Sequence, residues 1–180
     1  MTLIIVGESG SGKSTLAKTV QLYDGYHSIV VYTTRPPREG EIDGIDYHFI
    51  SEEEFLKRKQ EGFFAEWSEY RDWYYGTAKA DYTTDKKVVA VLTPRGMRQV
   101  KKSLDNVFTV HIQVDRRDRM IALLERGDAI EEAYRRNVSD LGQFDGVDDE
   151  VDFIVNNDGY KKLPIVLAQE LREAMEKNIK

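Results

Sequence analysis

Short apolar segments rich in β-branched residues alternate along the chain with longer segments of helical periodicity. The apolar segments cover 3–6, 29–31, 88–92, 107–114 and 153–155. Apolar stretches of this length are typical of strands that are covered on both faces. The segments between them predict helices over 14–22, 94–103, 115–126, 131–141 and 160–177, and Thr93 before Pro94 is a clear helix start. Strands separated by helices indicate an α/β fold with a five-stranded parallel sheet covered by helices.

The segment 35–85 departs from this alternation. It contains a loop rich in proline, glycine and charge, a short strand predicted over 46–50, and an aromatic-rich stretch over 63–75 that resembles antiparallel strands. Ser51 and Glu54 have the spacing of a capping box, which predicts a helix between these parts. We therefore predict a single domain over 1–180, with a core of 1–34 and 86–180 and an inserted mixed α/β lobe over 35–85.

Composition and charge narrow the classes of function. The chain of 180 residues has no cysteine, which excludes a disulfide framework, a zinc-thiolate site and a thiol nucleophile. The 26 basic and 32 acidic residues leave a formal charge of -6, so the average surface should repel nucleic acid and anionic lipid. The apolar run before Gly7 is too short for a signal peptide or a membrane span. These features predict a cytoplasmic protein with no nucleic-acid or membrane partner.

A phosphate-binding loop is the strongest motif of the chain. Residues 7–14 read G-E-S-G-S-G-K-S, which matches G-x-x-x-x-G-K-[ST] between a predicted strand and a predicted helix. Glycines let successive backbone N–H groups turn toward phosphate oxygens, and the helix directs its positive end at them. Lys13 can reach the β and γ phosphates of ATP, and the Ser14 hydroxyl can bind Mg²⁺. The predicted ATP-binding residues are Gly7, Glu8, Ser9, Gly10, Ser11, Gly12, Lys13, Ser14 and Thr15.

Two groups of arginines are further candidates for binding phosphate. Arg35 and Arg38 lie in a loop stiffened by two prolines, with tyrosines nearby, and would suit a monophosphate dianion. Taken alone, such a pair is more often a solvated surface feature. The stretch 115–136 carries six further arginines and is either a charged outer face or a lid over ATP.

The middle of the chain resembles the signature of the guanylate kinase family. Residues 33–49 read T-T-R-P-P-R-E-G-E-I-D-G-I-D-Y-H-F, and Glu66-Trp67 and the Y-Y-G-T of 74–77 look like its continuation. The resemblance extends through Arg126-Gly127, Arg136 and Asn156. It implies a P-loop NTPase fold with a nucleoside-monophosphate-binding lobe and a helical lid over about 126–143. The implied activity is the ATP- and Mg²⁺-dependent phosphorylation of GMP or dGMP.

The same resemblance implies a role for each matching residue. Glu66 would accept hydrogen bonds from N1–H and the exocyclic amine of guanine, which adenine cannot provide. Glu41 would orient Arg38 or a neighbouring donor. The implied phosphate-binding residues of the acceptor site are Arg35, Arg38, Tyr47 and Tyr75, with Thr77 and Thr93 as further substrate-binding residues. The implied catalytic residues are Lys13, Arg35, Arg38, Arg126 and Arg136, and Asn156 would contact ATP.

Four positions depart from the family pattern. Val91 and Thr93 replace two aspartates at the end of a parallel strand, Val31 replaces a serine that would contact the base, and Ala122 replaces the first lid arginine. The phosphate-binding residues are therefore retained, whereas base recognition is weakened. Each lost contact would cost about 1 to 3 kcal/mol.

Two alternative functions remain. The departures suggest that the acceptor could be another nucleoside monophosphate or a phosphorylated ribose. Independently of them, the chain could be a non-catalytic guanylate-kinase-like module that binds a phosphorylated peptide. Lys13 and Ser14 argue against the module, because such modules generally lack a working phosphate loop.

The acidic run over 145–152 is interpreted as a solvated turn without a basic partner, and the three histidines lack metal-ligand spacing. The sequence is compatible with a monomer or a homodimer.

Overall fold

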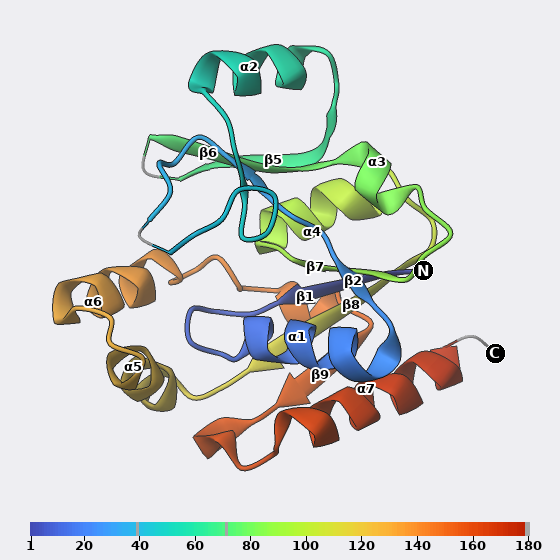
Figure 1. The fold of residues 1–180 in the computed structure, drawn as a ribbon. Helices are drawn as coiled ribbons and strands as arrows, with labels where there is room; N and C mark the ends of the chain where they lie inside the picture. Colours follow the sequence, from blue (N-terminus) through green and yellow to red (C-terminus); the bar gives the residue numbers. More distant parts are fainter. Residues whose placement is uncertain (39, 71, 179–180) are drawn as a thin grey trace.

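A computed structural model describes residues 1–38, 40–70 and 72–178, so Glu39 of the signature lies outside the described residues. Its strands form two separate sheets, one of five strands and one of four. In Figure 1 helices lie on both sides of the larger sheet, and the smaller sheet lies above it beneath helix α2 (Glu52–Gln60). The smaller sheet contains the strands of 35–85 together with residues 32–33, which were predicted to belong to the core.

The larger sheet is parallel throughout, as predicted. Its strand order is β2-β7-β1-β8-β9, and every neighbouring pair is parallel. The strands are β1 (Thr2–Val6), β2 (His27–Ser28), β7 (Val88–Val91), β8 (Val107–Gln113) and β9 (Phe153–Asn156). Because β1 is central, Leu3, Ile4, Ile5 and Val6 have no exposed surface, which explains the uninterrupted apolar run.

Alternate side chains of β1 pack into two cores on opposite faces of the sheet. Leu3 and Ile5 belong to a core with α1 (Lys13–Asp24) and α7 (Pro164–Asn178), and Ile4 and Val6 to a core with α4 (Pro94–Lys101). The predicted cap of α4 is confirmed, since Thr93 Oγ1 accepts a hydrogen bond from the Gly96 N–H at 3.1 Å.

The predicted start of the last helix at residue 160 is wrong. A 3₁₀ turn, η2 (Asp158–Tyr160), precedes α7, whose first residue is a proline.

The lobe is built on a four-stranded sheet of order β4-β3-β6-β5. Its strands are β3 (Tyr32–Thr33), β4 (His48–Phe49), β5 (Phe64–Tyr70) and β6 (Trp73–Ala78), and β5 and β6 are antiparallel, as predicted. Ser51 caps α2 by accepting a hydrogen bond from the Glu54 N–H at 3.1 Å, while the Glu54 carboxylate pairs with Arg58. A short helix after β6, α3 (Lys79–Tyr82), was missed by the sequence pattern.

The predicted strand over 29–31 is wrong. The chain leaves the parallel sheet after Ser28 and joins the lobe sheet at Tyr32. Ile29 N still donates to Val89 O at 2.9 Å, and Val31 O accepts from His48 N at 2.9 Å, so the segment has one hydrogen bond to each sheet. Its apolar run therefore marks the passage between the sheets, and β3 pairs with the lobe rather than with the core.

Helices α5 (Arg116–Glu125) and α6 (Ile130–Ser139) form a hairpin beside the loop that joins β1 to α1 (Figure 1). A 3₁₀ turn, η1 (Val147–Asp149), leads from it toward β9. The prediction that the acidic run over 145–152 lacks a basic partner is wrong, although Asp145, Asp148 and Asp149 are exposed. Glu150 accepts from Arg98 at 2.6 and 2.7 Å, and Asp148 Oδ1 lies 2.7 Å from His111 Nδ1. Within the described residues, no helix is long and apolar enough to cross a membrane.

Candidate functional site

The phosphate loop connects the buried strand β1 to the first turn of α1. Gly10 has a φ of 86°, and a Cβ at this position would lie 2.8 Å from the Arg119 carbonyl oxygen. Both the backbone conformation and the close approach to α5 therefore require glycine. Gly12, with a φ of 91°, precedes the first residue of α1. This geometry directs the N-terminus of α1 toward the loop, as the motif predicts.

Lys13 lies deep in the loop. Its Nζ donates a hydrogen bond to the Glu8 carbonyl oxygen at 2.8 Å. Burial lowers the pKa of Lys13 to about 8, against the opposing attraction of the Asp140 and Glu8 carboxylates. A negatively charged phosphate beside the ammonium group would stabilise its charged form. The electrostatics of this position thus favour a polyanion.

A cavity of about 520 Å³ lies over the loop. It is lined by residues of the loop, of α1, of the α5–α6 hairpin and of the segment that leads into α7, among them Ser9, Gly10, Ser11, Gly12, Lys13, Ser14, Thr15, Ala122, Arg126, Arg136, Asn157 and Tyr160. Seven of the nine ATP-binding residues predicted in the phosphate loop line this cavity. Gly7 and Glu8 do not, and the Glu8 side chain instead faces His111 and Arg119.

Asn156 is exposed and does not line the cavity over the loop, whereas the next residue, Asn157, is buried and does. Successive side chains of a strand point in opposite directions. At the end of β9 the two neighbouring asparagines therefore face different sides, and Asn157 rather than Asn156 faces the cavity. Asn157 is held by two hydrogen bonds with the Lys162 backbone, at 2.9 and 3.3 Å.

A second cavity of about 380 Å³ adjoins the first. The two share Ser9, Ser14, Arg126 and Arg136 as lining residues. The remaining lining residues of the second cavity are Arg35, Arg38, Tyr47, Trp73, Tyr75, Glu132 and Arg135. The fold therefore brings the lobe arginines and the lid arginines, which are about 100 residues apart in the sequence, to opposite sides of one space.

Arg35 is held in place by Glu41. One terminal guanidinium nitrogen donates to both carboxylate oxygens, at 2.7 and 2.9 Å, and the guanidinium carbon lies 5.2 Å from the centre of the Tyr47 ring. Only 5% of Arg35 is exposed. Hydrogen bonding to Arg35 lowers the pKa of Glu41, which therefore remains ionised at neutral pH. Glu41 also accepts from the Arg38 backbone N–H at 2.7 Å, so it orients the Arg35 side chain and the Arg38 main chain.

The lid arginines are also held by carboxylates. Arg126 donates to Asp128 from Nε at 3.0 Å, and Arg136 Nε donates to Glu132 Oε1 at 2.8 Å. Ala122, which stands where the family has an arginine, lines the cavity over the phosphate loop. The two arginines that were predicted to neutralise phosphate charge thus lie together where the first two cavities meet.

A third cavity of about 410 Å³ shares Tyr47 and Tyr75 with the second. Glu66, Thr93, Val31 and Val91 line it, so three of the four departures from the family pattern occur in one place. Arg95 and Gln143 also line it, and neither is among the residues predicted from the sequence. Arg95 is in the first turn of α4 and Gln143 follows α6, and neither belongs to a recognisable motif.

Glu66 is the buried carboxylate of the third cavity, with 5% of its surface exposed. Burial raises its pKa to about 7, although hydrogen bonds from Thr77 oppose this shift. Thr77 Oγ1 donates to Glu66 Oε1 at 3.0 Å and lies 2.8 Å from the Tyr82 hydroxyl. Thr77 does not line the cavity, and its contact with this site is the hydrogen bond to Glu66.

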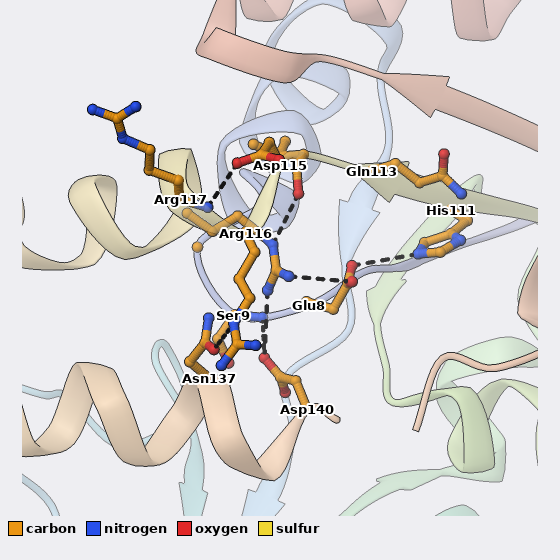
Figure 2. Close-up of polar contacts among 12 residues, drawn as sticks. Glu8, Ser9, His111, Gln113, Asp115, Arg116, Arg117, Asn137 and Asp140 are labelled. Atoms are coloured by element: carbon orange, nitrogen blue, oxygen red, sulfur yellow. Dashed lines mark hydrogen bonds and ion pairs between the residues drawn. The ribbon is translucent and has the colours of Figure 1, made fainter. Parts of the chain in front are cut away.

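Beneath the phosphate loop lies a network of charged side chains that Figure 2 shows in close-up. Glu8 Oε2 lies 3.6 Å from His111 Nε2, and Glu8 Oε1 lies 3.4 Å from a guanidinium nitrogen of Arg119. Burial lowers the pKa of His111, but hydrogen bonding to Glu8 and Asp148 outweighs it and leaves the pKa raised. Among the residues that the structure describes, no group of three His, Cys, Asp or Glu side chains could hold a metal ion.

The fold and these adjoining cavities define a P-loop domain of the nucleotide-phosphotransferase class. Residues 1–178 match the model of a protein family described as guanylate kinase. The chain belongs to the guanylate kinase family. This confirms the resemblance found in the sequence motifs.

Individual relatives agree with this assignment. The guanylate kinase of Wolinella succinogenes is 35% identical over 188 residues, which cover 98% of this chain and 86% of that protein. The guanylate kinase of Helicobacter pylori strain 26695 is 35% identical over 173 residues, covering 92% of this chain and 84% of that protein. A crystal structure of guanylate kinase from Anaplasma phagocytophilum matches 99% of this chain and 85% of that chain with a TM-score of 0.73 at 20% identity, which shows a shared fold.

Proposed function

We propose that the protein transfers the γ-phosphoryl group of ATP to GMP or dGMP, forming ADP and the guanosine diphosphate. The observation that carries this proposal is the continuity of the three cavities. Ser9, Ser14, Arg126 and Arg136 line both the first and the second, and two tyrosines line both the second and the third. Two nucleotides bound from opposite ends would therefore meet phosphate to phosphate. Membership of the guanylate kinase family supports the same activity.

ATP would occupy the cavity over the phosphate loop. The loop amides and Lys13 would bind its phosphates, and Ser11, Thr15 and Asn157 line the same space. The lysine would release the Glu8 carbonyl and turn to the β and γ phosphates. Its lowered pKa implies that ATP binding at alkaline pH takes up a proton.

GMP would place its phosphate in the second cavity. Arg35 is preoriented there by Glu41, and Arg38, Tyr47 and Tyr75 line the same space. A guanidinium group can form two parallel hydrogen bonds with a phosphate, and phenolic hydroxyls can donate further ones. The preorientation reduces the side-chain entropy that is lost on binding.

The base would enter the third cavity and contact Glu66. An ionised carboxylate can accept from both N1–H and the exocyclic amine of guanine, whereas adenine has an acceptor at N1. The Thr93 hydroxyl lines the cavity but already accepts a hydrogen bond from Gly96 N. We propose that Glu66, held by Thr77, is the main determinant of base choice.

The chemistry requires positioning and charge neutralisation rather than a nucleophilic side chain. An oxygen of the GMP phosphate attacks the γ phosphorus of ATP, a new P–O bond forms, and the bond to the bridging β–γ oxygen breaks as ADP leaves. Lys13, Arg126 and Arg136 would stabilise the charge on the transferred group. Exclusion of water by the lid and lobe would prevent hydrolysis of ATP.

Magnesium would be held by the Ser14 hydroxyl, which lines both phosphate cavities. The described residues offer no cluster of carboxylates for a cation. A single protein hydroxyl fits Mg²⁺ that takes its other ligands from phosphate oxygens and water. When bound, the ion would neutralise charge on the β and γ phosphates. We further propose a cytoplasmic enzyme acting on free nucleotides.

The proposal is tested by measuring ADP release with a panel of acceptors: GMP, dGMP, AMP, CMP, UMP and phosphorylated riboses. We expect GMP and dGMP to be the preferred acceptors. Comparable turnover with every base would contradict the assignment to guanine. Preference for a phosphorylated ribose would favour the alternative that the missing base contacts at Val31 and Thr93 suggest. Failure to bind ATP with Mg²⁺ at millimolar concentration would favour a non-catalytic module.

A further inference from the structure

Asp140 connects the lid hairpin to the phosphate loop. It is the C-cap residue of α6, and its Oδ2 accepts a hydrogen bond from the Ser9 backbone N–H at 2.7 Å. The two residues are 131 positions apart in the sequence. Figure 2 shows the Asp140 carboxylate directed at the loop from the end of this helix. Asp140 is not among the described residues that line the three cavities. Its carboxylate instead contacts protein groups, beginning with the Ser9 amide.

Arg119 of α5 supports the same carboxylate. One guanidinium nitrogen lies 3.9 Å from Asp140 Oδ2 and another lies 3.4 Å from Glu8 Oε1. Nε donates to the Val114 carbonyl at 2.9 Å, and the residue is 6% exposed. Glu8 of the phosphate loop and Asp140 at the end of α6 are thereby paired with one buried guanidinium group. A low-dielectric setting strengthens such contacts relative to the protein surface.

Arg136 lies one helical turn before Asp140. The Asp140 N–H donates to the Arg136 carbonyl at 3.1 Å, which closes the last turn of α6. Arg136 lines both the cavity over the phosphate loop and the adjoining second cavity. Because the turn between them is hydrogen-bonded, a carboxylate fixed on the loop also fixes the backbone that carries Arg136.

We propose that Asp140 is a positioning residue that holds the end of α6 on the Ser9 amide and so places Arg136 where the two phosphate cavities meet. This inference rests on the proposed function. No sequence motif contains Asp140, Arg119 or their spacing to the loop. The hydrogen bond and the ion pair act together: the first sets the distance of α6 from the loop, and the second keeps the carboxylate directed inward.

The first test compares Asp140→Ala and Asp140→Asn with the natural protein. We expect kcat to fall about tenfold to a hundredfold in Asp140→Ala, because a small displacement of a group that contacts the reacting phosphate has an effect of this size. KM for GMP should stay within about twofold, since Arg35 and Glu66 are untouched. Asp140→Asn keeps an acceptor for the Ser9 N–H but loses the ion pair, so its kcat should be intermediate.

Asp145→Asn is the matched control. Asp145 is exposed on the turn that follows α6, and its replacement changes the net charge by the same amount. We expect its kcat to equal that of the natural protein, and circular dichroism melting to show that all variants are folded. An unchanged kcat in folded Asp140→Ala, or an equal loss in Asp145→Asn, would overturn the proposal.

The second test is a double-mutant cycle with Arg136→Ala. If Asp140 acts through Arg136, adding Asp140→Ala to the Arg136→Ala background should lower kcat by less than about twofold. A full, additive loss would show that Asp140 serves the general structure only and would overturn the proposal.

Hydrogen exchange at the Ser9 amide provides a readout that needs no acceptor. It should become faster in Asp140→Ala than in Asp145→Asn. If exchange in Asp140→Ala stayed as slow as in the control, the role of Asp140 in holding α6 on the Ser9 amide would be overturned. If exchange became faster but the natural protein itself were inactive on GMP, only the proposed function would have failed.

Discussion

Gly96 lies directly against the carboxylate of Glu66. A Cβ built at residue 96 would be 2.8 Å from Glu66 Oε2 and 3.4 Å from its carboxyl carbon. Gly96 is in the first turn of α4, where its N–H is bound to the Thr93 hydroxyl. The start of this helix therefore forms a wall of the cavity that we assign to guanine, and the absence of a side chain leaves room for the Glu66 carboxylate.

Gly96→Ala should impair GMP binding without unfolding the protein. Alanine favours the helix by about 1 kcal/mol over glycine, but its methyl group would displace the Glu66 carboxylate. We expect KM for GMP to rise about tenfold, which corresponds to ~1.4 kcal/mol, with little change in KM for ATP. Steady-state kinetics and a melting curve check both parts. An equal rise in both KM values would place the defect outside the guanine cavity.

Glu66→Gln should change how stability depends on pH. The pKa of Glu66 is raised to about 7 in the folded protein, against 4.5 as the ordinary value, because the carboxyl group is buried. The protonated form therefore contributes stability below pH 4.5, and this contribution is lost as the pH rises through about 7. Glutamine is neutral at every pH, so the variant should gain up to about 3 kcal/mol relative to the natural protein between pH 4.5 and 8.

Urea unfolding of both proteins at several pH values measures this difference. Parallel pH profiles for Glu66→Gln and the natural protein would show that Glu66 ionises normally in the folded state. Glu53→Gln is a suitable control, because Glu53 is an exposed carboxylate in the first turn of α2.

Glu41→Gln should weaken binding of GMP and leave ATP unaffected. The substitution removes the charge that holds Arg35 through two hydrogen bonds of 2.7 and 2.9 Å. We expect KM for GMP to rise about tenfold, in line with the loss of a charge-assisted contact of ~1.5 kcal/mol. Glu54→Gln breaks an ion pair of 2.6 Å elsewhere in the lobe and should leave this KM unchanged. A comparable rise in the control would indicate a general effect on the lobe.

Thr93→Asp should raise activity on GMP. Aspartate caps a helix as well as threonine does, so the hydrogen bond from Gly96 N can be kept while a carboxylate is added to the guanine cavity. A new contact of ~1 to 3 kcal/mol predicts a rise in kcat/KM for GMP of about tenfold, with no rise for AMP. Unchanged or lower activity would show that other residues of this chain already replace the missing carboxylate.

The phosphate loop and the parallel sheet could be predicted from sequence because both depend on local patterns. Lys13 and Ser14 belong to a continuous motif, and the buried strands are continuous apolar runs. The 29–31 segment was misassigned because an extended, apolar passage between two sheets has the same pattern as a buried strand. Asn157 was missed in favour of Asn156 because a one-residue shift reverses the side-chain direction at the end of a strand.

Long-range contacts had no signal in the sequence. Asp140 meets Ser9, and Glu150 meets Arg98, only because the sheet order brings their elements together. Both carboxylates therefore resembled ordinary surface residues. Arg95 lines the cavity that we assign to guanine, but no motif predicts this. Its position depends on how α4 packs against β5 and not on its neighbours in the chain.

We propose that two nucleotides meet end to end between the phosphate loop and the lobe arginines. The decisive measurement is a crystal structure with GMP and a non-hydrolysable ATP analogue. We predict guanine against Glu66, the GMP phosphate between Arg35 and Arg38, and the γ phosphate beside Lys13 and Arg136. A structure in which the analogue fills the loop while the GMP phosphate lies away from Arg35 and Arg38 would contradict the account.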